Sequence, residues 1–445
     1  MIPKLELGNG VFADINDAIE AAAAAQKDYE KNLTIEDRKR IVEAVRKTLI
    51  ENAQFFSDME YEETGYGRPE DKIQKNLGNA IIPGVETLPM SVYSADDNGM
   101  VYDFYSPFGV IGALTPVTNP SATIAGNGIC NLSAGNAVVF NAHPAAKVST
   151  AIALQTVNKA VVAAGGPNNM LTCIAEPTLD TLDVIAKSPL VSLMIGTGGP
   201  AMVATLMKSG KKCICAGPGN PPSIVDETCN LAECAPTLIM SHSLENNTLC
   251  IGEKEVFVVD AIFDDFIEAM KATGMVRMLT DEEAAKVTAT ALQPNEKEIS
   301  GYSPVKKFVG KNANVILEAA GVACEGDPRT AVMIVDNDHP FVQTEQLMPI
   351  LPVVRCKDFE EAMERAVAAE HGNRHSASIW SEDIKRVTAF GKAVKTTAYV
   401  QCAMTMTAVP GSPTIATPTG EGPTGPWTFL RKRRLSQGGG RGYIA

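Results

Sequence analysis

Short apolar runs rich in β-branched residues alternate with helical segments over most of the chain. In the first block these runs cover residues 109–115, 137–141, 170–175, 190–196 and 212–217. The helical segments between them lie at about 120–133, 145–164, 178–187 and 200–209. This alternation is typical of βαβ units that build a parallel sheet. The sequence therefore predicts an α/β fold.

A second block repeats the pattern later in the chain. Its apolar runs cover residues 255–261, 332–336, 350–356, 376–381 and 398–402. Its helical segments lie at about 263–272, 281–291, 358–369 and 382–394. The 445 residues are too many for one ordinary core. We therefore expect two α/β lobes in series.

The two ends of the chain follow other patterns. Three helices are expected at the start, over residues 14–32, from a capping box at 34–37 onward, and over 69–80. Residues 90–108 are extended and aromatic in pattern, as in an arm of strands. Residues 407–427 are rich in Pro, Gly and Thr and predict a long loop with no regular element. The basic run 431–434 and the glycines after it predict a mobile tail.

Composition excludes several classes of function. The formal net charge is −13, which argues against nucleic acid as the main partner. Apolar residues make up 45% of the chain and charged residues 20%, which is ordinary globular composition. No apolar run approaches the roughly 20 residues that a membrane span needs. We expect a cytoplasmic protein that binds neither nucleic acid nor membrane.

Most of the ten cysteines lie in apolar stretches, where a thiol acts as a small core side chain. Neither the cysteines nor the five histidines show metal-ligand spacing, so we expect no metal site. Cys250 is different, because it lies in a polar, amide-rich segment, 243–255, that joins the two expected lobes. With Lys254 nearby and a glycine following, it is a candidate nucleophile of low pKa. An incidental surface cysteine is the alternative for this segment taken alone.

Two glycine-rich segments follow expected strands, at 196–200 and 217–221, but neither has the GxGxxG spacing. Open α/β sheets bind ligands at this edge. Backbone N–H groups at the helix start after Gly198 and Gly199 could hold a pyrophosphate. The alternative is that these glycines only start a helix or make a tight turn.

Several motifs occur together in one order. Residues 106–120 (SPFGVIGALTPVTNP), 135–139 (GNAVV) and 345–349 (EQLMP), with Cys250 between them, resemble the aldehyde dehydrogenase superfamily. More narrowly, TPVTNP, FNAHP, GTGGP, AGPGNPP, LCIGEKE, EHGNRHSAS and PTGEGPT resemble the CoA-acylating acetaldehyde and propionaldehyde dehydrogenases of bacterial microcompartments. These motifs run in family order from about residue 105 to 425. The resemblance implies two Rossmann-like α/β lobes with a β oligomerisation arm.

The resemblance also implies a mechanism. The Cys250 thiolate would add to an aldehyde carbonyl, and the oxyanion would be stabilised by the backbone N–H of Cys250 and the side chain of Asn119. Hydrolytic relatives carry their Asn one position earlier, at Thr118, so either side chain is open as the donor. Hydride would pass to NAD, whose ribose hydroxyls Glu345 would hold. The alternatives are a turn residue for Asn119 and a solvated loop acid for Glu345.

Hydrolytic relatives carry a glutamate that activates the deacylating water, whereas residues 215–220 (CAGPGN) contain no carboxylate. A thiolate attacks a thioester readily, so the sequence favours transfer of the acyl group to coenzyme A over hydrolysis. His375 would accept the CoA thiol proton, or else is a structural histidine. The remaining cofactor-binding residues implied are Thr115, Pro116, Val117, Asn141, His143, Gly196, Thr197, Gly198, Gly217 and Pro218.

The resulting hypothesis is an NAD-dependent, CoA-acylating dehydrogenase of propanal or acetaldehyde. The expected domains are a cofactor-binding domain (1–92 and 109–241), a catalytic domain (242–427) and an oligomerisation arm (93–108 and 428–445). The arm would make a homo-oligomer, a dimer or tetramer. By resemblance, the enzyme would work in the cytoplasm inside a bacterial microcompartment, with shell or cargo as further partners. The alternatives are a hydrolytic aldehyde dehydrogenase and an inactive nucleotide-binding homologue.

Overall fold

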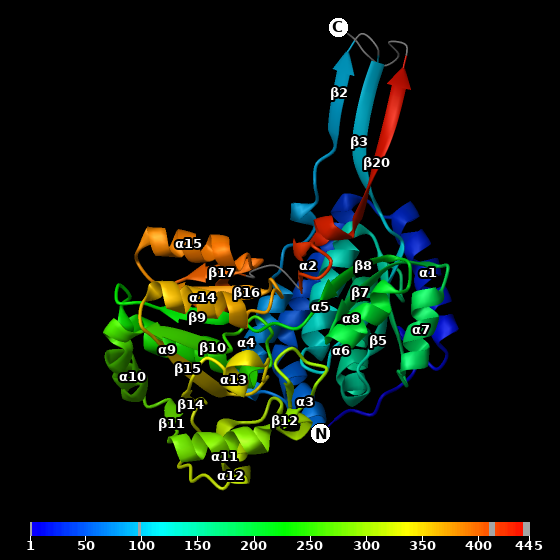
Figure 1. The fold of residues 1–445 in the computed structure, drawn as a ribbon. Coiled ribbons are helices and arrows are strands. Elements are labelled where there is room, and N and C mark those ends of the chain that lie inside the picture. The colour runs from blue at the N-terminus through cyan, green and yellow to red at the C-terminus, as the bar shows by residue number, and fades with distance from the viewer. Residues whose placement is uncertain (1, 97–98, 409–413, 439–445) are drawn as a thin grey trace. The chain divides into compact units, whose positions relative to one another are not determined.

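The computed structural model describes residues 2–96, 99–408 and 414–438, which divide into two compact units (Figure 1). Unit 1 comprises residues 1–63, 73–216 and 411–445, and unit 2 comprises residues 64–72 and 217–410. Helix α4 (Pro69–Ala80) has the expected bounds. Its residues up to Lys72 are assigned to unit 2, and the others are assigned to unit 1. Each unit is built on its own parallel sheet, as the alternating pattern predicted.

Unit 1 contains a six-stranded parallel sheet. Its order is β1 (Val11–Phe12), β6 (Leu171–Ile174), β5 (Ala137–Ala142), β4 (Val110–Thr115), β7 (Val191–Thr197) and β8 (Lys212–Ala216). All residues of β4, β5 and β6 are buried, as is usual for parallel strands with both faces covered. The helices are α1 (Ile15–Asn32), α2 (Ile35–Glu51), α3 (Ala53–Thr64), α5 (Pro120–Ala134), α6 (Lys147–Ala163), α7 (Leu179–Lys187) and α8 (Pro200–Met207).

Helix α3, which was not expected, supplies carboxylates to two other helices. Glu60 accepts a hydrogen bond of 3.0 Å from the backbone N–H of Ser121 in the first turn of α5. Glu63 accepts bonds of 2.9 and 2.7 Å from the backbone N–H groups of Val148 and Ser149 in the first turn of α6. The first N–H groups of a helix lack partners within it and favour negative charge. Helix α3 thereby fixes where α5 and α6 begin.

An antiparallel sheet of β2 (Val92–Asp96), β3 (Gly99–Pro107) and β20 (Leu430–Gly438) projects from the rest of unit 1 (Figure 1). The expected mobile tail is therefore wrong for residues 430–438, while residues 439–445 lie outside the described part. Strand β20 pairs with β3 along its full length, from Leu430 opposite Pro107 to Gly438 opposite Gly99. Asp103 on β3 binds Arg434 at 2.6 and 2.9 Å and Lys432 at 2.9 Å. The basic run is thus one side of a charged strand pair.

The expected long loop is also partly regular. Strands β18 (Ile415–Ala416) and β19 (Gly422–Pro423) form a short antiparallel pair, and a 3-10 turn follows at Pro426–Phe429. The expectation of no regular element over 407–427 is therefore wrong for these residues. Residues 409–413 lie outside the described part of the chain.

Unit 2 contains a seven-stranded parallel sheet. Its order is β11 (Val276–Met278), β14 (Thr330–Ile334), β15 (Ile350–Cys356), β10 (Glu255–Val259), β9 (Pro222–Val225), β16 (Ser376–Trp380) and β17 (Ala398–Gln401). A hairpin of β12 (Leu292–Pro294) and β13 (Tyr302–Pro304) lies outside it. The helices are α9 (Leu231–Ser243), α10 (Phe263–Ala272), α11 (Asp281–Ala291), α12 (Ala313–Ala319), α13 (Pro340–Gln343), α14 (Phe359–Ala369) and α15 (Ile384–Val394).

The division between the units falls between Ala216 and Gly217, and not at the expected residue 241. The reason is strand pairing, because β9 inserts between β10 and β16 at the centre of the second sheet. Helix α9, which follows β9, packs against α10 in the same unit. Residues 217–241 therefore belong with the lobe that carries Cys250. That one domain binds the cofactor and the other is catalytic stays a prediction.

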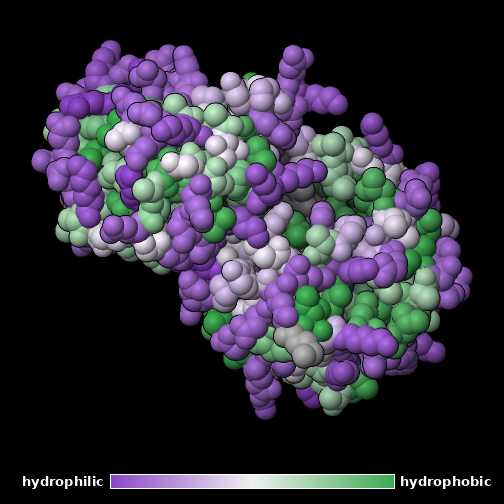
Figure 2. All heavy atoms as spheres, turned by 90° about the horizontal axis from the view of Figure 1, so that it is seen from below, coloured by the Kyte–Doolittle hydropathy of each residue, from purple (hydrophilic) through white to green (hydrophobic). Residues whose placement is uncertain are grey.

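Each unit has a hydrophobic core of its own, formed by the buried faces of its sheet and helices. On the face shown in Figure 2, hydrophilic residues cover much of the surface and hydrophobic ones lie in smaller groups between them. No helix in the described ranges is both long and apolar enough to span a membrane.

Candidate active site

Cys250 lies in a loop of unit 2 between α9 and β10, and not at a joint between the lobes as expected. The chain leaves α9 through the 3-10 turn Leu244–Asn247. Three successive residues of this turn, Glu245, Asn246 and Asn247, have positive φ angles of 54°, 53° and 60°. Non-glycine residues in this region cost about 1–3 kcal/mol each and persist only where surrounding contacts hold them. The loop that carries Cys250 therefore depends on its neighbours for its shape.

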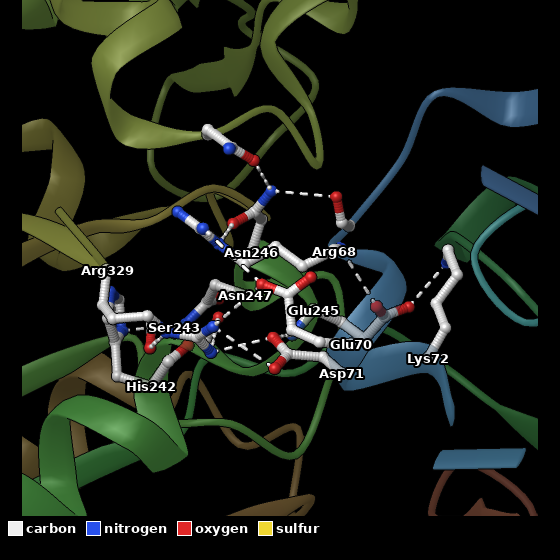
Figure 3. Close-up of polar contacts among 12 residues, drawn as sticks. Arg68, Glu70, Asp71, Lys72, His242, Ser243, Glu245, Asn246, Asn247 and Arg329 are labelled. Atoms are coloured by element: carbon white, nitrogen blue, oxygen red, sulfur yellow. Dashed lines mark hydrogen bonds and ion pairs between the residues drawn. The ribbon is translucent and has the colours of Figure 1, made fainter. Parts of the chain in front are cut away.

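Glu245 is held by a polar cluster from the segment 64–72 (Figure 3). Its carboxylate accepts a hydrogen bond of 2.6 Å from the Lys72 ammonium and one of 3.2 Å from the backbone N–H of Arg68. The backbone N–H of Glu245 donates a hydrogen bond of 2.8 Å to the Asp71 carboxylate. Lys72 and Glu245 are both buried. Both partners of a buried ion pair are needed, because removal of one leaves an unpaired charge in the interior, which is costly. Arg329 completes the cluster by binding Asp71 at 2.8 and 3.2 Å.

The two asparagines of the turn are held equally firmly. The Asn246 amide nitrogen donates hydrogen bonds of 2.9 Å to the Gly310 carbonyl and 2.8 Å to the Asn312 side-chain oxygen. The Asn246 side-chain oxygen accepts a hydrogen bond of 3.0 Å from the Arg68 guanidinium. The Asn247 amide donates 2.7 Å to the His242 carbonyl and 2.9 Å to the Glu253 carbonyl. Asparagine is favoured at positive φ. The amide-rich composition that singled out this segment is thus explained by its left-handed turn.

Gly219 brings Cys250, Glu345 and His375 together. A Cβ at Gly219 would lie 2.5 Å from the Cys250 carbonyl oxygen and 3.1 Å from Cγ of the His375 ring. The backbone N–H of Gly219 donates 3.1 Å to the Glu345 carboxylate. Only a residue without a side chain allows this approach. The loop that begins with Gly217 and Pro218 therefore gathers three of the predicted site residues within unit 2.

The thiol of Cys250 does not have the expected low pKa. Its side chain is only partly exposed, and burial together with the negative charge of Glu345 raises its pKa to about 12. The positive charge of Lys254 opposes this effect but does not outweigh it. The expectation of a low pKa is therefore wrong, although Lys254 acts on the thiol in the expected direction. The physical reason is that removal from water disfavours the thiolate.

His375 is fully buried at the start of β16. Burial, with the charge of Lys254, lowers its pKa to about 4, so the imidazole is neutral near pH 7. Its Nδ1 lies 3.4 Å from the Ser376 hydroxyl, and its Nε2 is buried with no hydrogen-bond partner among the described residues. Its backbone N–H donates 3.0 Å to Glu370, whose own pKa burial raises to about 7. A neutral ring with a free nitrogen can accept a proton.

Glu345 is a partly buried carboxylate and not a solvated loop acid. Burial raises its pKa, while Lys254 and the N–H of Gly219 favour its ionised form. It follows α13 in the segment that leads to β15. Its position next to the Gly217–Pro221 loop makes it available to a ligand that binds there.

The remaining predicted site residues lie in unit 1, mostly at one edge of its sheet. Strand pairing sets Leu114 opposite both Asn141 and Gly196, so the ends of β4, β5 and β7 lie side by side. Ligands bind at this edge in open α/β sheets. The residues concerned are Thr115, Pro116, Val117, Asn141, His143, Gly196, Thr197 and Gly198.

These groups are not equally available to a ligand. The Thr115 hydroxyl is buried without a partner in the described part of the chain, and the helix start after Gly199 has no side-chain cap. Both features suit a phosphate-containing cofactor such as NAD. Asn141, by contrast, donates 3.1 Å to the Thr178 carbonyl and accepts 2.7 Å from Thr181.

Two further residues at this edge have roles in local structure. His143 accepts 3.2 Å from the N–H of Ala145 and caps the 3-10 turn Pro144–Ala146. Gly196 is required by packing, because a Cβ there would lie 2.1 Å from the side chain of Leu206 in α8. A role of these residues toward a cofactor stays a prediction.

Asn119 is the residue before α5, and its side chain makes no capping bond to that helix. Its amide nitrogen lies 3.3 Å from the Thr118 hydroxyl, and its oxygen is buried without a partner among residues that the structure describes. The missing capping bond does not exclude the alternative that Asn119 is a turn residue before Pro120, which stays open. Which of the two side chains would face an oxyanion remains a prediction.

Sequence patterns missed the residues that support this site. The segment 64–72 lies in no motif, and the motifs that contain Gly219, Lys254 and Glu370 do not indicate what these residues contact. The bonds from the segment 64–72 to Glu245 and the bond of 3.1 Å between Gly219 and Glu345 join residues more than 100 positions apart. The amide-rich run before Cys250 was the one available signal.

Comparison with known proteins shows the family and the fold. The model of the aldehyde dehydrogenase family matches residues 6–413. An acetylating acetaldehyde dehydrogenase of Bilophila wadsworthia is 37% identical over 96% of this chain and 89% of its own length.

Two solved structures share the fold along nearly the whole chain. A propionaldehyde dehydrogenase from the fucose utilisation microcompartment of Clostridium phytofermentans has a TM-score of 0.92 at 39% identity, covering 97% of this chain and 98% of its own. A propionaldehyde dehydrogenase of Rhodopseudomonas palustris, solved with bound CoA and an acylated cysteine, has a TM-score of 0.92 at 35% identity, covering 97% and 99%. The chain belongs to the aldehyde dehydrogenase family.

Proposed function

We propose that this protein oxidises acetaldehyde or propanal with NAD and transfers the acyl group from Cys250 to coenzyme A. The observation that carries the proposal is the gathering of Cys250, Glu345 and His375 around Gly219. The acetylating acetaldehyde dehydrogenase and the CoA-bound propionaldehyde dehydrogenase support the choice of substrate and of CoA as acceptor. Unit 1 would then supply part of the nucleotide site, and unit 2 would supply the rest of it together with the groups that carry the chemistry.

The first step is addition of Cys250 to the aldehyde. The thiol gives up its proton to solvent and its sulfur forms a bond to the carbonyl carbon, while the carbonyl π electrons move to the aldehyde oxygen, which becomes negative. The backbone N–H of Cys250 and the side chain of Asn119 are the proposed donors to that oxygen. Cys250 is partly exposed as a residue, while its thiol is surrounded closely enough for burial to raise its pKa.

The second step oxidises the adduct to a thioester. NAD, when bound, supplies the hydride acceptor. The groups that would hold it are the Thr115 hydroxyl, the start of α8 after Gly198, the loop at Gly217 and Pro218, and the Glu345 carboxylate. Collapse of the oxyanion then leaves the acyl group on the Cys250 sulfur.

In the third step the acyl group moves from sulfur to sulfur. His375 accepts the proton of the CoA thiol at its free Nε2, the new thioester bond forms, and the Cys250 sulfur leaves as a thiolate. The proton returns to Cys250, so that no net proton remains on the enzyme in this step. The loop 215–220 has no carboxylate that would activate water instead.

The experiment that tests the function is NADH formation from propanal and from acetaldehyde, with and without CoA. We expect turnover that requires CoA and yields the acyl-CoA. Turnover that ignores CoA and yields a free acid would identify a hydrolytic enzyme and contradict the proposal. NAD binding without turnover would identify an inactive nucleotide-binding homologue. A Cys250→Ala variant should bind NAD and form no NADH.

The assembly and location are further parts of the proposal. The projecting sheet of β2, β3 and β20 would serve as an oligomerisation arm, giving a dimer or tetramer, because β2 is an edge strand whose residues are all exposed. The microcompartment origin of the Clostridium phytofermentans relative supports a place inside such a compartment in the cytoplasm. Co-purification with compartment shells would test the location.

A further inference from the structure

Lys254 is a fully buried lysine next to the candidate nucleophile. Its ammonium donates 3.0 Å to the Asn247 carbonyl and 2.9 Å to the Leu249 carbonyl, and it also bonds the Asn247 side-chain oxygen. An ammonium has three N–H donors, so these acceptors use all of them. All three oxygens belong to the loop that directly precedes Cys250.

The backbone of Lys254 is fixed as well. Its N–H donates 2.9 Å to the Pro221 carbonyl, and its carbonyl accepts 3.0 Å from the Gln346 amide. These two partners come from the segments that carry Gly219 and Glu345. Lys254 therefore connects the nucleophile loop to both other parts of the candidate site.

The charges around Lys254 and Cys250 act in opposite directions. Glu345 and Lys254 face Cys250, and the first disfavours a thiolate while the second favours it. Glu345, Glu253, Glu255 and Cys250 face Lys254, whose pKa burial lowers to about 8. Burial also raises the pKa of each of these three carboxyl groups. His375 is affected too, since the charge of Lys254 lowers its pKa.

We propose that Lys254 is a positioning residue for the nucleophile: its ammonium holds the carbonyls of Asn247 and Leu249, and its positive charge stabilises the Cys250 thiolate. The inference rests on the proposed function only in taking Cys250 as the nucleophile. It requires neither NAD nor CoA. The loss of the Cys250 proton brings a negative charge near the Lys254 ammonium, and the two charges attract each other.

The test is alkylation of Cys250 by iodoacetamide in the full chain without NAD, CoA or aldehyde. The rate is followed between pH 6 and 10 by mass spectrometry of the peptide that contains Cys250. Lys254→Gln and Lys254→Met should slow alkylation at pH 7 by about tenfold, which corresponds to one pKa unit. Lys254→Arg keeps the charge and should restore the rate to within about threefold of the original chain.

The matched control is the double variant Lys72→Met with Glu245→Gln. It removes another buried lysine from the same loop support together with the carboxylate of its ion pair. We expect it to lower thermal stability without the tenfold loss of Cys250 alkylation. Equal slowing in this control would overturn the charge role, because loop displacement alone would then explain the result.

An unchanged alkylation rate in folded Lys254→Gln would overturn the proposal as a whole. If circular dichroism shows that neither Lys254→Gln nor Lys254→Met folds, the test depends on Lys254→Arg. A tenfold slower alkylation of Cys250 in that variant would overturn the proposal. Alkylation does not depend on turnover. A failure of the proposed function, seen as no CoA-dependent NADH formation, is thus distinguishable from a failure of this inference.

Discussion

At the scale of single residues, Gly219 sets the closest contacts of the candidate site. The substitution Gly219→Ala would place a methyl group 2.5 Å from the Cys250 carbonyl oxygen, so the backbone must move. Displacement of about 1 Å near reacting groups can cost about a hundredfold in rate. We expect kcat to fall by roughly tenfold to a hundredfold, measured as NADH formation with saturating substrates.

The control for this substitution is Gly78→Ala. Gly78 lies inside helix α4 with nothing within 4 Å of a built Cβ. Alanine in a helix interior is favoured over glycine by about 1 kcal/mol. The control should therefore raise thermal stability slightly and retain activity, and equal loss in both variants would contradict the special role of Gly219.

The charge of Glu345 makes a prediction with a definite sign. Its carboxylate raises the pKa of Cys250, so its removal should lower that pKa. We expect Glu345→Gln to speed the alkylation of Cys250 by iodoacetamide at pH 8 severalfold, while NAD-dependent turnover should fall if Glu345 holds the ribose as proposed. Slower alkylation in this variant would show that the carboxylate does not face the thiol.

His375 should make stability depend on acid pH. Its pKa is about 6.5 in an unfolded chain and about 4 in the folded protein, so the unfolded state binds the proton first as pH falls. Stability from the neutral ring is present above about pH 6.5 and is lost as pH falls toward 4. The loss is of the order of 3 kcal/mol.

Urea unfolding of the original chain and of His375→Asn between pH 7 and 4 measures this loss. The variant should lose less stability over that interval. Buried His242, whose pKa burial lowers to about 3, remains in both chains and contributes equally to each. Parallel stability curves for the two chains would contradict the assignment.

At the scale of elements, the long parallel strands and their following helices could be predicted from the sequence. Strands such as β15 and helices such as α10 match their expected bounds, because a fully buried strand reads as a continuous apolar run. Helix α3 was missed because polar and apolar residues are mixed along AQFFSDMEYEET with little one-sided pattern. Strand β9 was also missed, because it is only four residues long and begins with proline.

The resemblance placed residues 428–445 in a β arm, but the basic run itself indicated a mobile tail, for an electrostatic reason. A run of four basic residues indicates a solvated segment when it is considered alone. Its pairing becomes favourable only because Asp103 lies on the neighbouring strand, more than 300 positions away. The site shows the same limit: family motifs marked Cys250, Glu345 and His375, whereas the contacts that fix their loop and the raised pKa of Cys250 come from segments distant in sequence.

The pairing of β20 with β3 therefore gives a prediction of its own. Lys432 and Arg434 hold the pKa of Asp103 well below its usual range, so the ion pairs should persist into acid. In Asp103→Asn we expect faster hydrogen exchange of the β20 amides and faster cleavage by trypsin within residues 431–434. High salt should have the same effect on the original chain but not on the variant. Unchanged exchange would show that backbone pairing alone holds the strand.

At the scale of the whole molecule, each unit buries its own hydrophobic residues, whereas the three-stranded sheet is largely exposed. The cores are closed within their own units, but the three-stranded sheet has many exposed side chains and an open edge at β2. Such an edge offers unpaired backbone groups to another chain. An isolated hairpin is only marginally stable in water, so β2 and β3 need β20 to keep their shape.

Removal of residues 430–445 should therefore disrupt self-association as well as the arm. We expect the shortened chain to sediment as a smaller species than the full chain, because β2 no longer presents an ordered edge to a second copy. A chain that ends after Gly438 keeps all of β20 and is the matched control, which should sediment like the full chain. If the chain without residues 430–445 retains the mass of the full assembly, the arm is not the oligomerisation element. Self-association would then have to be sought on other surfaces of the two units.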